Sequence, residues 1–520
     1  DLYSSGLKIY TTIDTRMQKL AEDAARKQMK RIQHEFDQHW AGQEPWRDEK
    51  GNVIPGFIEG IAERQPFYKR LVQKYPNHQD SVLYYLNKPH KVKLFDYEKG
   101  TIEKEMSSMD SIRYMVKFMH CSMVAMEPDT RAVRAWVGDV DFDTWKYDKV
   151  VAERQPGSTF KLFVYSEAMN QGLTPCDKRR DEYISMQVLD KKTGLMQTWR
   201  PTNANGRFSG DSIPLHLAFA QSINSIAVRL GQEMGIKNII QTAQEMGIKS
   251  PMVDEPSLAL GASDVNLLEM TDAYSTIANY GEHRDPVVIT RILDQEGNEV
   301  YVAPRDHNQA ITYKSAFFMQ QLLKAGLTDP KGTSRTLKQY IFDDTDWGGK
   351  TGTSNNHSDA WYMAVSPKIV VGAWVGGEYR SIHFRTGALG QGSKTALPIC
   401  GEFIYSLMRD RRFQKYHAKW QLDPDEDIDP AAYNCNAYVP QKTYTIDDTL
   451  NNARVHQQDN NNEEVNEENI DENGIENQEL PAPAAPNMPQ HNAAPEHQNM
   501  PPAENTPPIK QMKKPKVEQI

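Results

Sequence analysis

The sequence predicts an α+β fold in which helices pack on an antiparallel sheet. Two hairpins are the basis of this prediction. The first has its turn at 127–130, and the second spans 359–375 with its turn at 366–368. Helical patterns lie between them, for example at 158–170 and 223–234. Hairpins on either side of a helical middle are typical of a sheet covered by helices.

The start of the chain predicts a strand followed by a helix. The alternation of side chains from Leu7 to Ile13 is that of one strand face. Asp14 is placed to cap the helix that follows. Apolar residues then recur at helical spacing, at Met17, Leu20, Ala21 and Ala24.

The length of 520 residues allows roughly three units at about 150 residues each. Residues 31–118 lack a clean period, and 451–520 contain no aromatic residue but 13 Asn and 10 Pro. Such a tail buries too little apolar surface to offset its ordering entropy, so we expect disorder. The expected units are a linker at 1–30, an accessory subdomain at 31–118, the main domain at 119–415, an extension at 416–444 and a disordered tail at 445–520.

Composition excludes several classes of function. The net charge of −10 argues against a nucleic-acid-binding protein. We expect no metal or cofactor: Asp139, Asp141 and Asp143 alternate without calcium-loop spacing, and the four cysteines form no C-x-x-C pair. Cys400 and Cys435 either pair in an oxidising compartment or stay as free buried thiols.

No apolar run approaches the roughly 20 residues of a membrane span. No signal peptide is visible, and the chain starts at Asp1 rather than Met. We therefore expect a fragment or processed form, whose lack of an anchor says little about its parent.

The first motif that carries chemistry is RQPGSTFK, with Ser158 and Lys161 three residues apart. On a helix this spacing places both side chains on one face. A serine hydroxyl is a weak nucleophile until a base takes its proton, and a lysine can do so only as the neutral amine. Taken alone, S-x-x-K is more typical of an ordinary helix N-cap followed by a surface lysine than of a catalytic pair.

The second motif is Ser222-Ile223-Asn224, on a loop before an apolar helix. Ser222 is placed to relay a proton to a leaving amine. Asn224 is placed to bind a substrate carbonyl and to orient Lys161. S-x-N alone is a weak signal.

The third motif is WGGKTGTSNN, which precedes the second hairpin. Lys350 offers a cation that favours the neutral form of Lys161. The hydroxyls of Thr351 and Thr353 suit a carboxylate, and Gly352 lets a substrate backbone approach closely. The backbone N–H groups of Ser158 and Thr353 are candidates for an oxyanion hole. Taken alone, the segment is also typical of a glycine-rich turn.

The ordered set resembles the motifs of penicillin-binding proteins and related β-lactamases. RQPGSTFK, LALGASDVNLLEMTDAYSTIANYG and KTGTSNNHSDAWYMAVSP resemble the transpeptidase domain of class A, bifunctional penicillin-binding proteins. GLKIYTTIDTRMQKLAEDA resembles the segment after their glycosyltransferase domain. The resemblance covers about 1–30 and 120–410. It implies helices on both sheet faces and an all-helical subdomain.

The resemblance also implies a function. Ser158 would attack the penultimate D-alanine of a peptidoglycan stem peptide, and an amine of a neighbouring stem would take the acyl group. β-Lactams would acylate Ser158. A periplasmic or extracytoplasmic location, through an anchor outside this chain, is implied as well.

Other functions stay open. A serine β-lactamase shares the motifs; Glu255-Pro256 is suggestive of its deacylation loop, but Ala259 stands where that loop has Asn. A penicillin-binding receptor would acylate once without transpeptidation. D,D-carboxypeptidase activity, with water as the acceptor, is compatible with the same motifs.

Overall fold

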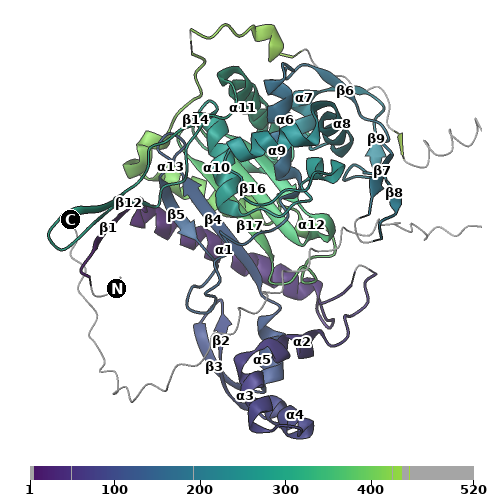
Figure 1. Cartoon of the computed structure of the whole chain (residues 1–520), viewed down its shortest axis with the longest axis vertical. Helices are drawn as coiled ribbons and strands as arrows, with labels where there is room; N and C mark the ends of the chain where they lie inside the picture. The colour runs from purple at the N-terminus through teal and green to yellow at the C-terminus, as the bar shows by residue number, and fades with distance from the viewer. Residues whose placement is uncertain (1–4, 49, 191–192, 424, 436–443, 446–520) are drawn as a thin grey trace, which may run out of the picture. The chain divides into compact units, whose positions relative to one another are not determined.

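The computed structural model describes residues 5–48, 50–190, 193–423, 425–435 and 444–445. Its main feature is a five-stranded antiparallel sheet in the order β15-β16-β17-β4-β5 (Figure 1). The strands are β4 (Met119–Met126), β5 (Val133–Val137), β15 (Gly348–Thr353), β16 (Asp359–Val365) and β17 (Val370–Gly377). Both predicted hairpins are confirmed, as β4–β5 and β16–β17.

The helices around this sheet come mostly from the chain between the two hairpins. They are α1 (Thr15–His39), α6 (Lys161–Asn170), α7 (Leu215–Ala220), α8 (Asn224–Met234), α9 (Ile236–Glu245), α10 (Leu267–Ala278), α11 (Tyr313–Thr328), α12 (Gly387–Gly390) and α13 (Ala396–Arg409). The 3₁₀ helices are η1 (Gly157–Phe160), η2 (Pro256–Leu260), η3 (Arg335–Tyr340), η4 (Asn355–His357), η5 (Arg411–Tyr416) and η6 (Pro430–Ala432).

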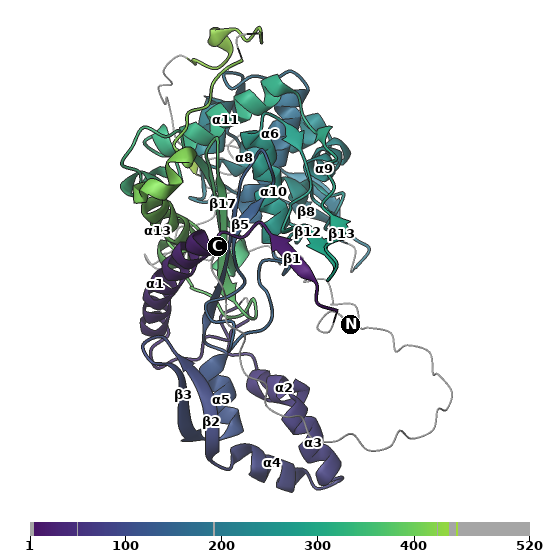
Figure 2. The same ribbon diagram turned by 90° about the vertical axis from the view of Figure 1, so that its left-hand side faces the viewer.

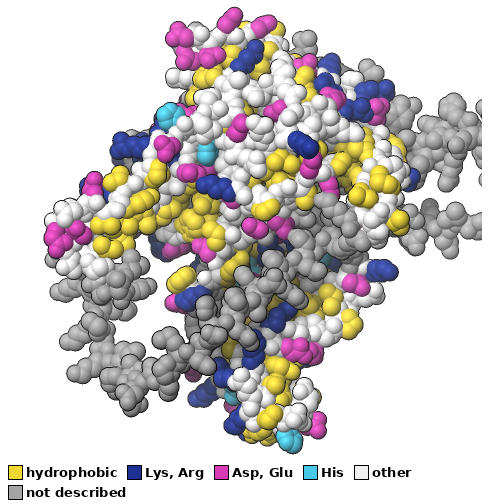
Figure 3. Space-filling model, viewed as in Figure 1, with side chains coloured by type: hydrophobic (Ala, Val, Ile, Leu, Met, Phe, Trp, Pro, Cys, Tyr) yellow, Lys and Arg dark blue, Asp and Glu magenta, His cyan; other side chains and the backbone are white. Residues whose placement is uncertain are grey.

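Short strands form small sheets outside the centre. They are β1 (Lys8–Thr11) with β12 (Ile289–Leu293) and β13 (Glu299–Val302); β6 (Lys178–Arg180) with β10 (Ser212–Pro214); β7 (Met186–Leu189) with β8 (Met196–Trp199); β11 (Glu282–His283) with β14 (Asn308–Gln309); and β9 (Arg207–Phe208) with β18 (Tyr444–Thr445). The β1–β12–β13 sheet leaves apolar side chains such as Val300 and Tyr301 exposed (Figure 3).

Both faces of the central sheet are covered by helices, as Figure 2 shows. Along β16, Trp361 and Met363 point into a core shared with α6, α8, α10 and α11. The alternate residues Tyr362 and Ala364 point into a second core, shared with α1 and α13. Because neither face meets water, the central strands β16 and β17 are apolar at nearly every position. The predicted α+β class, with helices on both faces, is confirmed.

Helix α1 begins where the sequence predicts. Asp14 accepts hydrogen bonds from the backbone N–H groups of Arg16 and Met17 and so caps the helix. Its buried face packs against β4, β5 and α13. The helix continues to His39, past the predicted limit at residue 30. Strand β1 is confirmed too, but its residues are exposed, so its alternating pattern does not mark a buried face.

The segment without a clean period forms short elements. They are α2 (Phe57–Arg64), α3 (Pro66–Lys74), α4 (Gln79–Asn87), the hairpin β2 (His90–Asp96)–β3 (Gly100–Met106), and α5 (Ser108–Met115). Beyond α1, which ends at His39, no described helix of this segment is longer than nine residues, so a helical period has little length over which to appear.

Of the two alternatives for Cys400 and Cys435, the free buried thiol is confirmed for Cys400, and both are wrong for Cys435. Cys435 is bonded to Cys176, not to Cys400. Cys400 lies buried on α13, with its Sγ 3.7 Å from the Val371 oxygen of the sheet, and Cys121 is buried in β4. Both free thiols lie in the core that the sheet shares with α1 and α13. The predicted tail lies, from residue 446 on, outside the described residues.

Within the described part of the chain, no helix is both long and apolar enough to span a bilayer.

Candidate active site

Ser158 lies in the 3₁₀ turn η1, and Lys161 is the first residue of α6. The sequence predicts one continuous helix here, but the first turn is the tighter form. In a 3₁₀ turn, residues three apart are eclipsed, so the spacing again places both side chains on one side. The turn is anchored where the Tyr274 hydroxyl donates to the Thr159 oxygen at 2.9 Å. Ser158 is half-buried, whereas Lys161 is fully buried.

The amines of Lys161 and Lys350 converge on one hydroxyl. Lys161 Nζ lies 2.6 Å from Asn224 Oδ1, 2.8 Å from the Ser222 backbone oxygen and 3.3 Å from Ser222 Oγ. Lys350 Nζ donates to the same Oγ at 2.9 Å and to the Thr351 oxygen at 3.0 Å. The structure thus brings together four residues that the sequence singled out on three separate segments: Lys161 on the first, Ser222 and Asn224 on the second, and Lys350 on the third. Ser158 lies on the turn that leads into Lys161.

Ser222 takes this position because of how α7 ends. The Ser222 N–H donates to the Phe219 oxygen, and the Ile223 N–H donates to the Ala218 oxygen. These two bonds are those of a Schellman motif, whose αL residue is usually glycine. Ser222 occupies that place with φ of 59°, which costs a non-glycine residue about 1–2 kcal/mol. Such strain in a structured turn is common at functional sites.

The third motif forms an edge strand of the sheet. Among the described strands, β15 pairs with β16 alone. Its residues also contact η1, which carries the first motif. Thr351 donates its hydroxyl to Thr333 Oγ1 at 2.8 Å, and Thr353 Oγ1 accepts the Gly392 N–H at 3.2 Å. Gly352 lies so close to the first motif that a Cβ on it would be 2.4 Å from the Pro156 oxygen.

Gly157 closes the contact between the first and third motifs. Its φ is 52°, and a Cβ there would lie 2.5 Å from the Thr353 oxygen and 3.1 Å from the Thr353 nitrogen. Only a residue without a side chain fits this approach. The backbone just before Ser158 is therefore held directly against the backbone of Thr353.

Burial sets the electrostatics of the two lysines. Loss of solvation lowers the pKa of Lys161 well below its usual value, and repulsion by Lys350 lowers it further. Burial lowers the pKa of Lys350 to about 7. Protonating both buried amines at once is opposed by their mutual repulsion and by the loss of solvation, so one amine is neutral near neutral pH.

Sequence reasoning missed two supporting residues. Asn203 accepts hydrogen bonds from the backbone N–H groups of Asn224 and Ser225. Thr333 donates its backbone N–H to the Ala220 oxygen at 3.0 Å and so connects the loop of the second motif to Thr351. Neither residue has a sequence signal, because each reaches its partner from a distant part of the chain.

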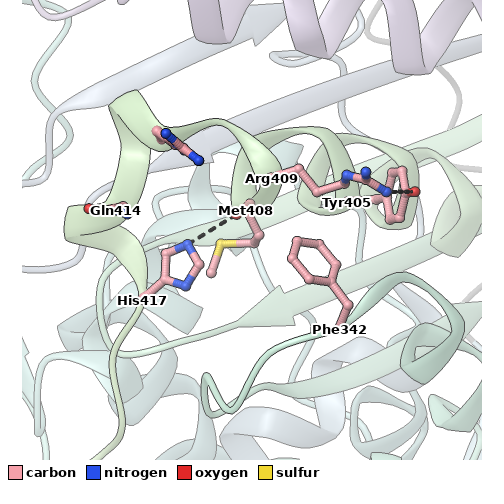
Figure 4. A pocket seen from close by; sticks show the side chains of 7 residues that line it. Phe342, Tyr405, Met408, Arg409, Gln414 and His417 are labelled. Atoms are coloured by element: carbon pink, nitrogen blue, oxygen red, sulfur yellow. Dashed lines mark hydrogen bonds between the residues drawn. The ribbon is translucent and has the colours of Figure 1, made fainter.

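A pocket of about 570 Å³ lies elsewhere, on the layer of α13 (Figure 4). Its lining residues are Phe342, Tyr405, Met408, Arg409, Arg411, Gln414 and His417. Here Arg409 donates to the Tyr405 hydroxyl, and His417 Nε2 lies 3.1 Å from the Met408 oxygen. None of the motif residues lines this pocket, and α13 covers the sheet face opposite α6 and α8.

Comparisons with known families match most of the folded chain. Residues 121–373 match the penicillin binding protein transpeptidase domain, and residues 41–119 match the penicillin-binding protein middle domain.

Individual proteins agree with these matches. Penicillin-binding protein 1A of Neisseria lactamica is 28% identical over 445 residues, covering 79% of this chain and 54% of that protein. Its counterpart in Rickettsia conorii is 27% identical over 464 residues, covering 79% and 55%. The chain thus spans about half the length of the curated relatives it matches.

Two solved structures share the fold. Penicillin-binding protein 1A from Haemophilus influenzae has a TM-score of 0.60 at 23% identity, covering 85% of this chain and 72% of that one. PonA1 from Mycobacterium tuberculosis has a TM-score of 0.55 at 17% identity, covering 85% and 94%.

Proposed function

Because residues 121–373 form the transpeptidase domain of the penicillin-binding proteins, we propose that this chain is a serine D,D-transpeptidase that cross-links peptidoglycan stem peptides. The observation that supports the serine mechanism best is the convergence of two buried amines on Ser222, next to the turn that carries Ser158. This arrangement supplies a base, a proton relay and a nucleophile within one site.

In the first half-reaction, neutral Lys161 takes the proton of Ser158 as its oxygen attacks the carbonyl of the penultimate D-alanine. The backbone N–H groups of Ser158 and Thr353 stabilise the oxyanion, each by a factor of about 10²–10³ in rate. The C–N bond to the terminal D-alanine then breaks. The amine of the departing D-alanine is protonated through the Ser222 hydroxyl, which can receive a proton from Lys161 or from Lys350.

In the second half-reaction, an amine of a neighbouring stem attacks the Ser158 ester. The new amide C–N bond forms, the ester C–O bond breaks, and the proton of the amine returns through Lys161 to Ser158. The bonds and protons of the two half-reactions therefore balance without a cofactor.

Substrate is held along β15. The free edge of this strand suits an extended peptide, which would pair with it as an added strand. The hydroxyls of Thr351 and Thr353 bind the terminal carboxylate, and Gly352 leaves the backbone open to the substrate. Asn224 binds a substrate carbonyl through its amide. A β-lactam, which mimics the D-Ala-D-Ala end, would take the same place and acylate Ser158.

For the parent protein we propose a preceding glycosyltransferase domain and a membrane anchor that holds the enzyme on the periplasmic side. Residues 1–30 would then connect the two domains, with 31–118 and 119–415 as the folded units of this chain and 416–444 as an extension. The partial coverage of the relatives supports a longer parent.

The test of the nucleophile is labelling by a fluorescent penicillin. Ser158→Ala should abolish labelling while the melting temperature stays near wild type. Ser166→Ala is the matched control: its buried hydroxyl has no hydrogen-bond partner among the described residues, so its loss should be harmless. Labelling that persists in Ser158→Ala would refute the assignment.

Two further assays separate the alternatives. A transpeptidase gives one stoichiometric burst with nitrocefin, whereas a β-lactamase turns it over steadily. With a D-Ala-D-Ala peptide, a transpeptidase forms the amide product when an acceptor amine is added. A carboxypeptidase releases only the hydrolysed peptide, and a receptor releases nothing.

A further inference from the structure

The N-terminus of α8 is capped from outside its own segment. The residue before the helix, Ile223, has no side chain that can accept a hydrogen bond. Asn203 Oδ1 fills this role, lying 2.9 Å from the Asn224 nitrogen and 3.2 Å from the Ser225 nitrogen. An amide oxygen facing the first N–H groups of a helix stabilises that end.

Asn203 is itself fixed by a buried carboxylate. Its Nδ2 donates to Asp181 Oδ1 at 2.8 Å and to the Arg207 oxygen at 2.8 Å. Asp181 also accepts the Ser225 hydroxyl at 2.6 Å and the Ser209 backbone N–H at 2.8 Å. Asp181 is 4% exposed and Asn203 is 8% exposed. Hydrogen bonds to a buried charged group are stronger than neutral ones, so the Asn203 amide has one defined orientation.

The same loop also holds the Asn224 side chain. The Thr202 oxygen accepts the Asn224 Nδ2 at 2.8 Å. This bond fixes which way the amide faces, so that Asn224 Oδ1 points at Lys161 Nζ, 2.6 Å away. Both the backbone and the side chain of Asn224 are therefore held by residues 202–203.

We propose that Asn203, oriented by Asp181, is a positioning residue of the acyl-transfer reaction, which sets Asn224 against the amine of Lys161. This inference rests on the proposed function of the site. Asn203 does not touch substrate. It acts through Asn224, and its effect should appear in the chemical step rather than in the binding of the β-lactam.

The experiment measures acylation by a chromogenic β-lactam under stopped flow, with the dissociation constant K and the acylation rate constant k2 resolved. Asn203→Ala should lower k2 by about 100-fold, the order expected for a small misplacement of a reacting group. K should change much less than k2, since Thr351 and Thr353 still bind the carboxylate and only the Asn224 contact with the carbonyl is displaced. Asn205→Ala, an exposed asparagine on the same loop, should leave both constants at wild-type values.

A reciprocal exchange makes the test specific. Asn203→Asp alone places two carboxylates face to face and should lower k2. Combining it with Asp181→Asn restores one donor and one acceptor across the pair and should recover most of k2. Circular dichroism and thermal melting report the folded fraction of every variant.

Each outcome decides the question. If wild type is acylated at Ser158 but Asn203→Ala keeps a normal k2, the positioning role is wrong and the proposed function stands. If Asn203→Ala lowers the melting temperature and the amount of active protein but not k2, its role is only structural and the inference is again wrong. If wild type is not acylated at all, the proposed function itself fails.

Discussion

The role of Lys350 can be tested by removing its charge. Lys350→Met keeps a long unbranched side chain in a buried site while taking away the second amine. The amines of Lys161 and Lys350 lie 3.3 and 2.9 Å from Ser222 Oγ. The two nitrogens are therefore at most about 6 Å apart, where two unit charges repel by about 3 kcal/mol at an effective dielectric constant of 20.

This repulsion fixes the direction of the effect. It disfavours protonated Lys161, and it acts while Lys350 is charged, below its pKa of about 7. Without Lys350, Lys161 holds its proton to higher pH, so less neutral base is present at any pH below the plateau. The ascending limb of the acylation rate should move to higher pH by about 2 units. Burial, the larger cause of the lowered pKa of Lys161, remains in the variant.

The assay is the second-order rate of β-lactam acylation from pH 5 to pH 10, with folding checked at each pH. The matched control is Lys331→Met. Lys331 is exposed and its charge is screened by solvent, so this variant should leave the ascending limb of the pH profile where it is in wild type. If Lys350→Met folds but the ascending limb of its pH–rate profile stays at the wild-type pH, the argument that Lys350 helps to hold Lys161 neutral is refuted.

Two more predictions concern the frame of the site. Gly157→Ala should slow penicillin labelling, because the new Cβ would push against the Thr353 backbone. Gly172 is the matched control, since its φ is also positive but a Cβ there would meet nothing within 4 Å. Gly172→Ala should lower the free energy of unfolding by about 1–2 kcal/mol and leave the labelling rate unchanged. In an oxidised sample, alkylation after denaturation should modify two of the four cysteines before reduction and all four after it, since Cys176 and Cys435 are paired; four without reduction would contradict the disulfide.

Local features were predictable where a few neighbouring residues determine them. Asp14 predicted the start of α1 because its carboxylate meets N–H groups two and three residues away. The hairpin that follows the K-T-G segment was predictable from two apolar runs on either side of a turn. The segment that carries S-x-x-K was predictable as the start of a helix, although its first turn is 3₁₀ rather than α.

Features that depend on long-range contacts were not predictable. Asn203 caps a helix that starts 21 residues later, and nothing in its neighbourhood marks it as a cap. The disulfide joins cysteines 259 residues apart, and sequence cannot choose among pairings. Ser222 adopts a positive φ that most sequences reserve for glycine, because the end of α7 and two lysine amines together fix it.

The most direct test of the central claim is to locate the β-lactam adduct. After treatment with benzylpenicillin and digestion with trypsin, the added mass should lie on peptide 155–161, and fragmentation should place it on Ser158 rather than on Thr159. An adduct on any other residue, or a protein whose mass does not change, would contradict the proposed acyl-enzyme.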